Sequence, residues 1–158
     1  MPKIQDMLGL HLVTFTKLFR LFLPEMRERR CGAIINVSSV AGLMPLPYLS
    51  LYAATKAFMV SLGDGVGCEA AKYGVVVQTC CPGRTETDFH ETAGVKAYRA
   101  PGGEQTADDV VAESLAALDR GRSLIITGRR NRVLAGLQWI LPRRAVLWAA
   151  ERVLRPST

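Results

Sequence analysis

The chain has 158 residues, of which 49% are hydrophobic and 22% are charged, and this composition excludes a largely disordered chain. Its length suits a single domain. The net charge of +6 is confined to residues 129–158, which hold seven arginines and one acid, so we expect a neutral body over residues 1–128 and a basic tail.

The first predicted element is an amphipathic helix over residues 3–29. Five leucine and phenylalanine residues recur at helical spacing between Leu8 and Phe22, and Pro24 could bend the helix. A short apolar run over residues 33–37 follows and is typical of a buried strand in a parallel sheet.

A second helix is predicted over residues 50–72. It contains Gly63, Gly65 and Gly67, and each glycine in a helix interior costs about 1 kcal/mol relative to alanine. We do not interpret this Gly-x-Gly-x-Gly run as a phosphate-binding loop, because no strand precedes it.

Two strands and one helix complete the predicted body. Residues 75–80 form an apolar strand that ends at Pro82-Gly83, and residues 123–127 form the last strand. Between these strands, a polar stretch over residues 84–103 is predicted to be loop-like, with one short helix as an alternative. A helix that Thr106 is expected to cap follows it. The alternation of helices with three strands predicts an α/β fold: a partial Rossmann-like, doubly wound parallel sheet with right-handed crossovers.

The tail is predicted to form two helices separated by Pro142. Apolar residues recur at helical spacing in both, and in the first they are Val133, Leu137 and Ile140. We expect these stripes to pack on the body while the arginines face solvent. Peripheral contact with a membrane is a second interpretation, because Trp139 and Trp148 suit an anionic interface. Nucleic-acid binding is not expected, since no recognised module accompanies the charge.

The cysteine content and the N-terminal region indicate the cellular compartment in which the chain is expected. Four cysteines show no C-x-x-C spacing, and with two histidines in the chain we identify no metal-binding constellation. This usage predicts a reducing, cytoplasmic environment. Charged residues interrupt the apolar N-terminal region, so we expect neither a signal peptide nor a membrane-spanning segment.

Candidate chemistry lies in the stretch INVSSVAGLMPLPYLSLYAATK, residues 35–56. Tyr52 and Lys56 are four residues apart and share one helix face, and a nearby ammonium lowers the pKa of a phenol. Such a tyrosine can exchange a proton with a carbonyl or alcohol oxygen. Ser39 follows a strand, at the edge where open α/β sheets bind ligands, and could hydrogen-bond the same oxygen. The tyrosine–lysine spacing alone is weak, because any helix surface can produce it.

The segments AIINVSSVAG, YAATK and VVVQTCCPGRTETDF together resemble the second half of a short-chain dehydrogenase/reductase, in particular members that act on lipophilic ketones and alcohols. The resemblance implies hydride transfer with NAD or NADP as the cofactor. It implies that Ser39 orients the substrate, Tyr52 is the acid/base, and Lys56 is its partner. It further implies cofactor contacts from Tyr52, Lys56, Pro82, Gly83, Thr85 and Thr87.

The chain also departs from the family pattern. No glycine-rich strand–turn–helix precedes the first helix, so we expect the chain to lack the N-terminal dinucleotide-binding half. His11 falls where most members carry an asparagine of the proton relay, and a neutral imidazole could serve there. An ordinary hydrogen-bonded helix histidine is the alternative, just as Thr85 and Thr87 could be turn residues.

The sequence also predicts that this chain associates with another chain. In the family, two long helices form a dimer interface, which implies a homo- or hetero-oligomer through residues 3–29 and 50–72. Without the preceding half, the strand at residues 33–37 would become an apolar edge that recruits another chain or aggregates. The alternatives to a truncated oxidoreductase are therefore a non-catalytic interaction subunit and a peripheral membrane protein.

Overall fold

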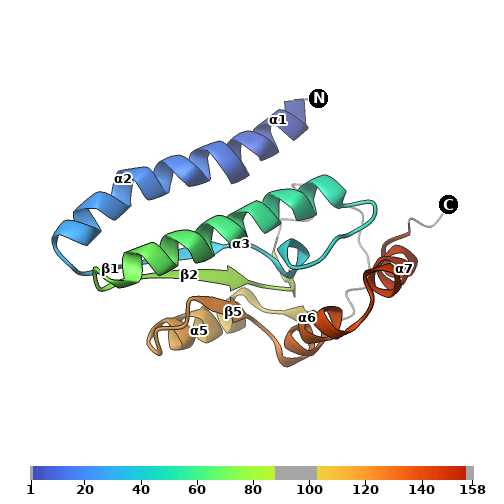
Figure 1. The fold of residues 1–158 in the computed structure, drawn as a ribbon. Coiled ribbons are helices and arrows are strands. Elements are labelled where there is room, and N and C mark those ends of the chain that lie inside the picture. Colours follow the sequence, from blue (N-terminus) through green and yellow to red (C-terminus); the bar gives the residue numbers. More distant parts are fainter. Residues whose placement is uncertain (1, 88–102, 156–158) are drawn as a thin grey trace.

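The computed structural model describes residues 2–87 and 103–155, and its centre is a three-stranded parallel sheet (Figure 1). The strand order is β1-β2-β5, with β1 at Gly32–Val37, β2 at Val75–Cys81 and β5 at Leu124–Ile126. The predicted α/β class, the three strands and their parallel arrangement are confirmed. The parallel pairing brings the carboxyl ends of β1 and β2 to one edge of the sheet.

Helices cover both faces of β2. Helix α3 (Ser50–Ala71) lies on the face that carries Val77 and Thr79, whereas α5 (Ala107–Leu118) lies on the face that carries Gln78. Ser114 of α5 donates to Gln78 Oε1 at 2.6 Å. All of β2 is therefore buried or half-buried.

The expectation of uniformly right-handed crossovers is wrong. The connections β1–α3–β2 and β2–α5–β5 step in the same direction across the sheet, yet their helices pass over opposite faces (Figure 1). Two such connections have opposite hands, so one of them departs from the usual right-handed rule.

The apolar core lies between β2, α3 and the N-terminal helical run. Phe19 and Leu23 of α2 (Phe15–Glu28) pack with Ala70, Val75 and Val77. The predicted helix over residues 3–29 is present as α1 (Pro2–Leu8), a π-helical segment (Gly9–Thr14) and α2. Phe19 of the predicted apolar stripe is buried, but Phe22 is 50% exposed and Leu23, which lies outside the stripe, is buried instead. The periodicity also did not predict the π-helical segment in the middle of the run.

Strand β1 forms an open edge of the sheet. Among the described strands it pairs with β2 alone, and Val37 is 57% exposed. A hollow of about 370 Å³ runs between this edge and α2. The expected apolar edge is present, while its recruitment of another chain remains a prediction.

The stretch expected to be a loop, residues 84–103, begins with the short strand β3 (Arg84–Thr85), which pairs with β4 (Glu104–Gln105) just beyond the stretch. Most of the rest of the stretch lies outside the described residues. Arg84 and Glu104 join these strands by an ion pair. Thr106 caps α5 as predicted, accepting from the backbone N–H of Asp109 at 3.1 Å.

The tail forms α6 (Arg129–Ile140) and α7 (Arg143–Leu154), with Pro142 between them. Asn131 and Ala135 are the buried residues of α6, whereas the predicted packing stripe is exposed. The expectation that Val133, Leu137 and Ile140 pack on the body is therefore wrong. The small side chain of Ala135 allows α6 to approach the body on the opposite face.

One helical run also satisfies the length and composition of a membrane span. It covers Lys3–Glu28, with a mean hydropathy of 1.2 over its most apolar window, of which 17% is buried. The expectation that no segment has the length and composition of a membrane span is thus not met. A core helix or a signal sequence satisfies the same criteria, so the finding is weak evidence for a span.

Candidate functional site

Ser39 lies two residues after the end of β1, where the chain turns into the short 3₁₀ helix η2 (Val40–Gly42). Its Oγ accepts from the Ala41 N–H at 3.1 Å and lies 3.5 Å from the Pro82 carbonyl oxygen. The second contact is longer than a normal O–H···O hydrogen bond. The hydroxyl proton of Ser39 is therefore weakly held and can be redirected to another acceptor.

The neighbouring Ser38 has a structural role. It is buried, and its Oγ donates to the Lys56 carbonyl oxygen at 2.9 Å. Gly42 brings η2 against the same turn of α3, because a Cβ there would lie 2.6 Å from the Lys56 carbonyl carbon. These two contacts hold the Ser39 loop against the helix turn that carries Lys56.

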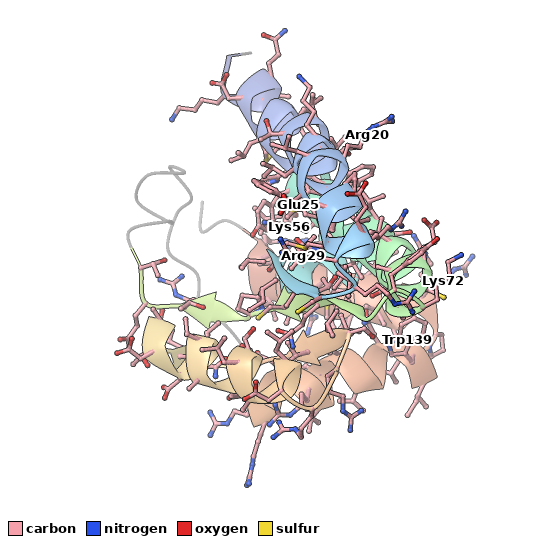
Figure 2. The ribbon with its side chains drawn as sticks, turned by 90° about the vertical axis from the view of Figure 1, so that its left-hand side faces the viewer. Arg20, Glu25, Arg29, Lys56, Lys72 and Trp139 are labelled. Carbon is pink, nitrogen blue, oxygen red and sulfur yellow. The ribbon has the colours of Figure 1, made fainter. Side chains whose placement is uncertain are left out.

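Lys56 is buried, and Figure 2 shows it within the body while Lys72 lies at the surface. Its Nζ donates to the Val37 carbonyl oxygen at 3.3 Å and lies 3.6 Å from Met59 Sδ. Burial lowers the pKa of Lys56 to about 8, partly opposed by Cys81. The amine is therefore charged at neutral pH and sits near its titration point.

Tyr52 lies one turn before Lys56 on α3 and is half-buried. The Lys56 Nζ is 5.8 Å from the centroid of the Tyr52 ring, within cation–π range. The predicted pairing of tyrosine and lysine on one helix face is therefore present. Its catalytic role remains a prediction.

His11 approaches the same tyrosine from the π-helical segment. Its ring centroid is 6.1 Å from that of Tyr52, and its Nδ1 is 2.9 Å from Thr55 Oγ1. Thr55 donates its single hydroxyl proton to the Tyr52 carbonyl oxygen at 2.8 Å. In this arrangement Nδ1 carries the imidazole proton and donates to Thr55, so Nε2 is the unprotonated nitrogen.

The charge state of His11 follows from the same surroundings. Burial, together with the charge of Lys56, lowers the pKa of His11 to about 4. The imidazole is therefore neutral at neutral pH, as a relay role requires. The position of His11 in the sequence, where most family members carry a relay asparagine, identified it as a candidate relay residue. Nothing in the sequence identified its hydrogen-bond partner Thr55.

Pro82 and Gly83 lie at the same edge as Ser39. The Pro82 carbonyl oxygen accepts from the Val40 N–H at 3.0 Å. A Cβ on Gly83 would lie 2.3 Å from Asn131 Nδ2, so only glycine allows α6 to approach this turn. Asn131 itself is buried and donates to the Thr127 carbonyl oxygen at 2.9 Å. Sequence reasoning missed Asn131, because nothing local distinguishes it from other tail residues.

Of the remaining predicted residues, Thr85 lies within the turn and Thr87 lies beyond it. Thr85 Oγ1 donates to the Gly83 carbonyl oxygen at 3.3 Å, as expected if Thr85 is an ordinary turn residue. Thr87 is exposed in a bend. Neither arrangement tests a cofactor contact.

The structure thus links Ser39, Lys56 and the Pro82–Gly83 turn at one sheet edge, with Tyr52 beside Lys56. The 370 Å³ hollow next to β1 includes Val37 and Met59, the two residues that contact Lys56 Nζ. Neither Ser39 nor Tyr52 lines this hollow.

Comparison with known proteins relates this arrangement to one family. The family model described as short chain dehydrogenase matches residues 1–96. Because that match begins at residue 1, it does not support the expectation that the chain lacks an N-terminal half.

Two curated proteins are similar in sequence to this chain, one over 79 residues and the other over 133. The very-long-chain 3-oxoacyl-CoA reductase of Anas platyrhynchos is 40% identical over 79 residues, which are 50% of this chain and 25% of that protein. The 7beta-hydroxysteroid dehydrogenase of Mediterraneibacter gnavus is 32% identical over 133 residues, 82% of this chain and 50% of that protein. The chain therefore spans half or less of the length of these relatives.

Solved structures share the fold. A short-chain dehydrogenase from Sphingobium yanoikuyae in complex with NADPH aligns with a TM-score of 0.73 and 29% identity, over 86% of this chain and 54% of that one. A short chain dehydrogenase from Burkholderia cenocepacia in complex with NADP aligns with a TM-score of 0.77 over 98% of this chain and 62% of that one. At 22% identity, the second alignment shows likeness of fold alone.

Proposed function

Because this chain belongs to the short-chain dehydrogenase family, we propose that it takes part in the NAD(P)-dependent interconversion of a ketone and an alcohol. The observation that carries the proposal is the position of Lys56, a buried amine 3.3 Å from the end of β1 and 5.8 Å from the Tyr52 ring. Burying an amine is costly, so its presence at a ligand-binding edge points to function.

Tyr52 exchanges the proton in this proposal. In the direction of reduction, its hydroxyl gives a proton to the substrate oxygen, and in oxidation its phenolate takes the proton back. The Lys56 charge stabilises the phenolate across the short distance between them. Ser39 turns its hydroxyl from Pro82 to the substrate oxygen and thereby holds that oxygen near Tyr52.

The residues at this edge fit the nicotinamide end of the cofactor. When bound, the nicotinamide supplies or accepts the hydride. An ammonium has three donors, and the partners of Lys56 Nζ described above are one carbonyl oxygen and one thioether, which leaves donor capacity for a ribose hydroxyl. The residues that would hold this end are Tyr52, Lys56, Pro82, Gly83, Thr85 and Thr87.

We propose a lipophilic carbonyl or alcohol as the substrate. Support comes from two relatives, named for very-long-chain 3-oxoacyl-CoA and for a 7beta-hydroxysteroid, whose acyl chain and ring system are both apolar. The apolar hollow beside Val37 and Met59 has the same character.

Cofactor titration tests the proposal. NADH and NADPH are each added to the full chain, and the nucleotide fluorescence is followed up to millimolar concentration. We expect saturable binding of at least one nucleotide, weakened about tenfold in Lys56→Met, a loss on the scale of one charge-assisted hydrogen bond. Lys72→Met is the matched control, since Lys72 is exposed at the C-cap of the same helix. Failure of both nucleotides to bind would exclude catalysis by this chain.

A second candidate function is an interaction subunit that pairs through residues 3–29 and 50–72. It is supported by a hollow of about 270 Å³ on α3, lined by Phe58, Leu62, Gly65 and Val66 among others, and by exposed apolar residues such as Leu10 and Leu21. Light scattering after size exclusion should then report an oligomer. Gly65→Glu places a charge in that hollow and should convert the oligomer to the monomer.

A further inference from the structure

The surface of α6 carries large apolar side chains that the body does not cover. Trp139 and Ile140 are each 82% exposed, and Leu141 continues the apolar run into the turn before α7. Val133 and Ile140 are seven residues apart and therefore share a helix face. This face is opposite to Asn131 and Ala135, the buried residues of α6.

Arginines surround this apolar surface. Arg129 and Arg130 begin α6, and Arg143 and Arg144 begin α7 immediately after the turn. All four are exposed, and no salt bridge to any of them is found among the described residues. In contrast, Arg132 pairs with Glu113 at 2.9 Å. The four arginines at the helix starts thus carry charge that no described acidic side chain pairs with.

We propose that this tail surface docks on an anionic lipid surface. We define the tail surface by the exposed apolar residues Val133, Leu137, Trp139, Ile140 and Leu141 and by the arginines Arg129, Arg130, Arg143 and Arg144. Indole and aliphatic side chains insert at the boundary between headgroups and acyl chains, while arginines reach the phosphates around them.

Charge complementarity selects this partner. Residues 129–158 hold seven arginines and one glutamate, so the tail opposes a negative surface with a net charge of +6. A purely polyanionic partner such as RNA would use the arginines but would leave the aliphatic Ile140 and Leu141 exposed. An apolar protein partner would use these side chains but would have to desolvate the arginines.

The tail is attached next to the candidate site. Asn131 of α6 lies against Gly83, and α7 contacts the loop before Tyr52 through Tyr48, which interacts with Glu151 and Arg155. Figure 1 places α6 and α7 beside the end of the sheet where β2 terminates. Docking would therefore hold this edge of the sheet close to the lipid surface.

Vesicle flotation of the full chain tests the proposal. The probes are phosphatidylcholine vesicles with and without phosphatidylglycerol. We expect binding only to the anionic vesicles, reduced about tenfold in the double variant Trp139→Ser/Ile140→Ser and also in Arg129→Gln/Arg130→Gln. All four residues are exposed, so these variants are expected to fold, and circular dichroism checks this. Nucleotide is absent throughout, so the result is independent of the proposed oxidoreductase activity.

Val111→Ser is the matched control, because Val111 is 54% exposed on α5, outside the tail. Binding that survives the control and falls in both tail variants supports the proposal. No binding to anionic vesicles overturns it, and so does an equal loss with Val111→Ser. If heparin binds the parent chain and Trp139→Ser/Ile140→Ser equally well and vesicles do not bind, the surface recognises polyanions and the lipid proposal fails.

Discussion

Gly63 of α3 lies directly against Thr79 of β2, where a Cβ on the glycine would come within 2.3 Å of Thr79 Oγ1. The same Cβ would lie 3.0 Å from Asn36 Nδ2. Asn36 is buried and donates to Thr79 Oγ1 at 3.2 Å and to the Met59 carbonyl oxygen at 3.0 Å. The missing side chain therefore lets α3 approach a buried polar cluster that joins β1 and β2.

Gly63→Ala should destabilise the chain by about 1–3 kcal/mol, because the new methyl group forces the helix away from this cluster. Gly65→Ala should instead raise stability by up to about 1 kcal/mol, since nothing lies within 4 Å of a Cβ there and alanine favours helix. Urea unfolding followed by circular dichroism measures both. Equal effects at the two positions would contradict this packing.

Lys56→Met should increase the free energy of unfolding at pH 7 by about 1–3 kcal/mol while abolishing cofactor-dependent activity. Burial lowers the pKa of Lys56 to about 8, so the folded state bears a cost for keeping the amine charged at pH 7. Methionine has a similar shape without the charge, and the loss of the hydrogen bond to Val37 offsets part of the gain.

The stability advantage of Lys56→Met should depend on pH with a definite sign. Because the folded pKa lies below the unfolded value of 10.5, the unfolded parent chain binds more protons between pH 8 and 10.5. The stability of the parent chain therefore rises with pH in that window, and the advantage of methionine shrinks. Urea unfolding at several pH values measures the difference in unfolding free energy between Lys56→Met and the parent chain, with Lys72→Met as the exposed control. An advantage that stays constant up to pH 10.5 would show that Lys56 does not titrate as described.

His11→Gln should reduce the acid sensitivity of the fold. The folded pKa of about 4 lies below the ordinary value of 6.5, so the unfolded state binds the extra proton between these pH values. The parent chain therefore loses stability as the pH falls from 6.5 to 4, and the variant should lose about 1–2 kcal/mol less, after allowance for the partial exposure of the ring. Thermal unfolding of both proteins across this range measures the difference, which should be constant above pH 7.

Tyr52→Phe should lower the rate of nicotinamide oxidation with a lipophilic ketone by about 10²–10⁴-fold, because the phenol proton has no substitute in phenylalanine. The change removes one oxygen from a half-buried ring and should leave the fold intact. Tyr73→Phe, in the turn after the C-terminal end of α3, is the control and should keep its activity. Comparable activity in Tyr52→Phe and the parent chain would refute the proposed acid/base role.

The sequence alone determined the local elements and the grouping of residues within each. Helical spacing of leucine and phenylalanine predicted the N-terminal helix, and apolar runs predicted the three strands. The four-residue spacing of Tyr52 and Lys56 was enough to place both on one helix face. Ser39 was assigned to the end of a strand in the same way. Each of these inferences depends on chain geometry over a few residues, which local order along the chain specifies.

Tertiary structure decided which faces are covered and which groups are desolvated. The stripe of α6 has regular helical spacing, yet the body covers Ala135 and leaves Ile140 in solvent. The lowered pKa of Lys56 and the neutral state of His11 likewise arise from burial among elements distant in the chain. Periodicity identifies the faces that a helix has, but the burial of any one face depends on surfaces that only the folded chain brings to it.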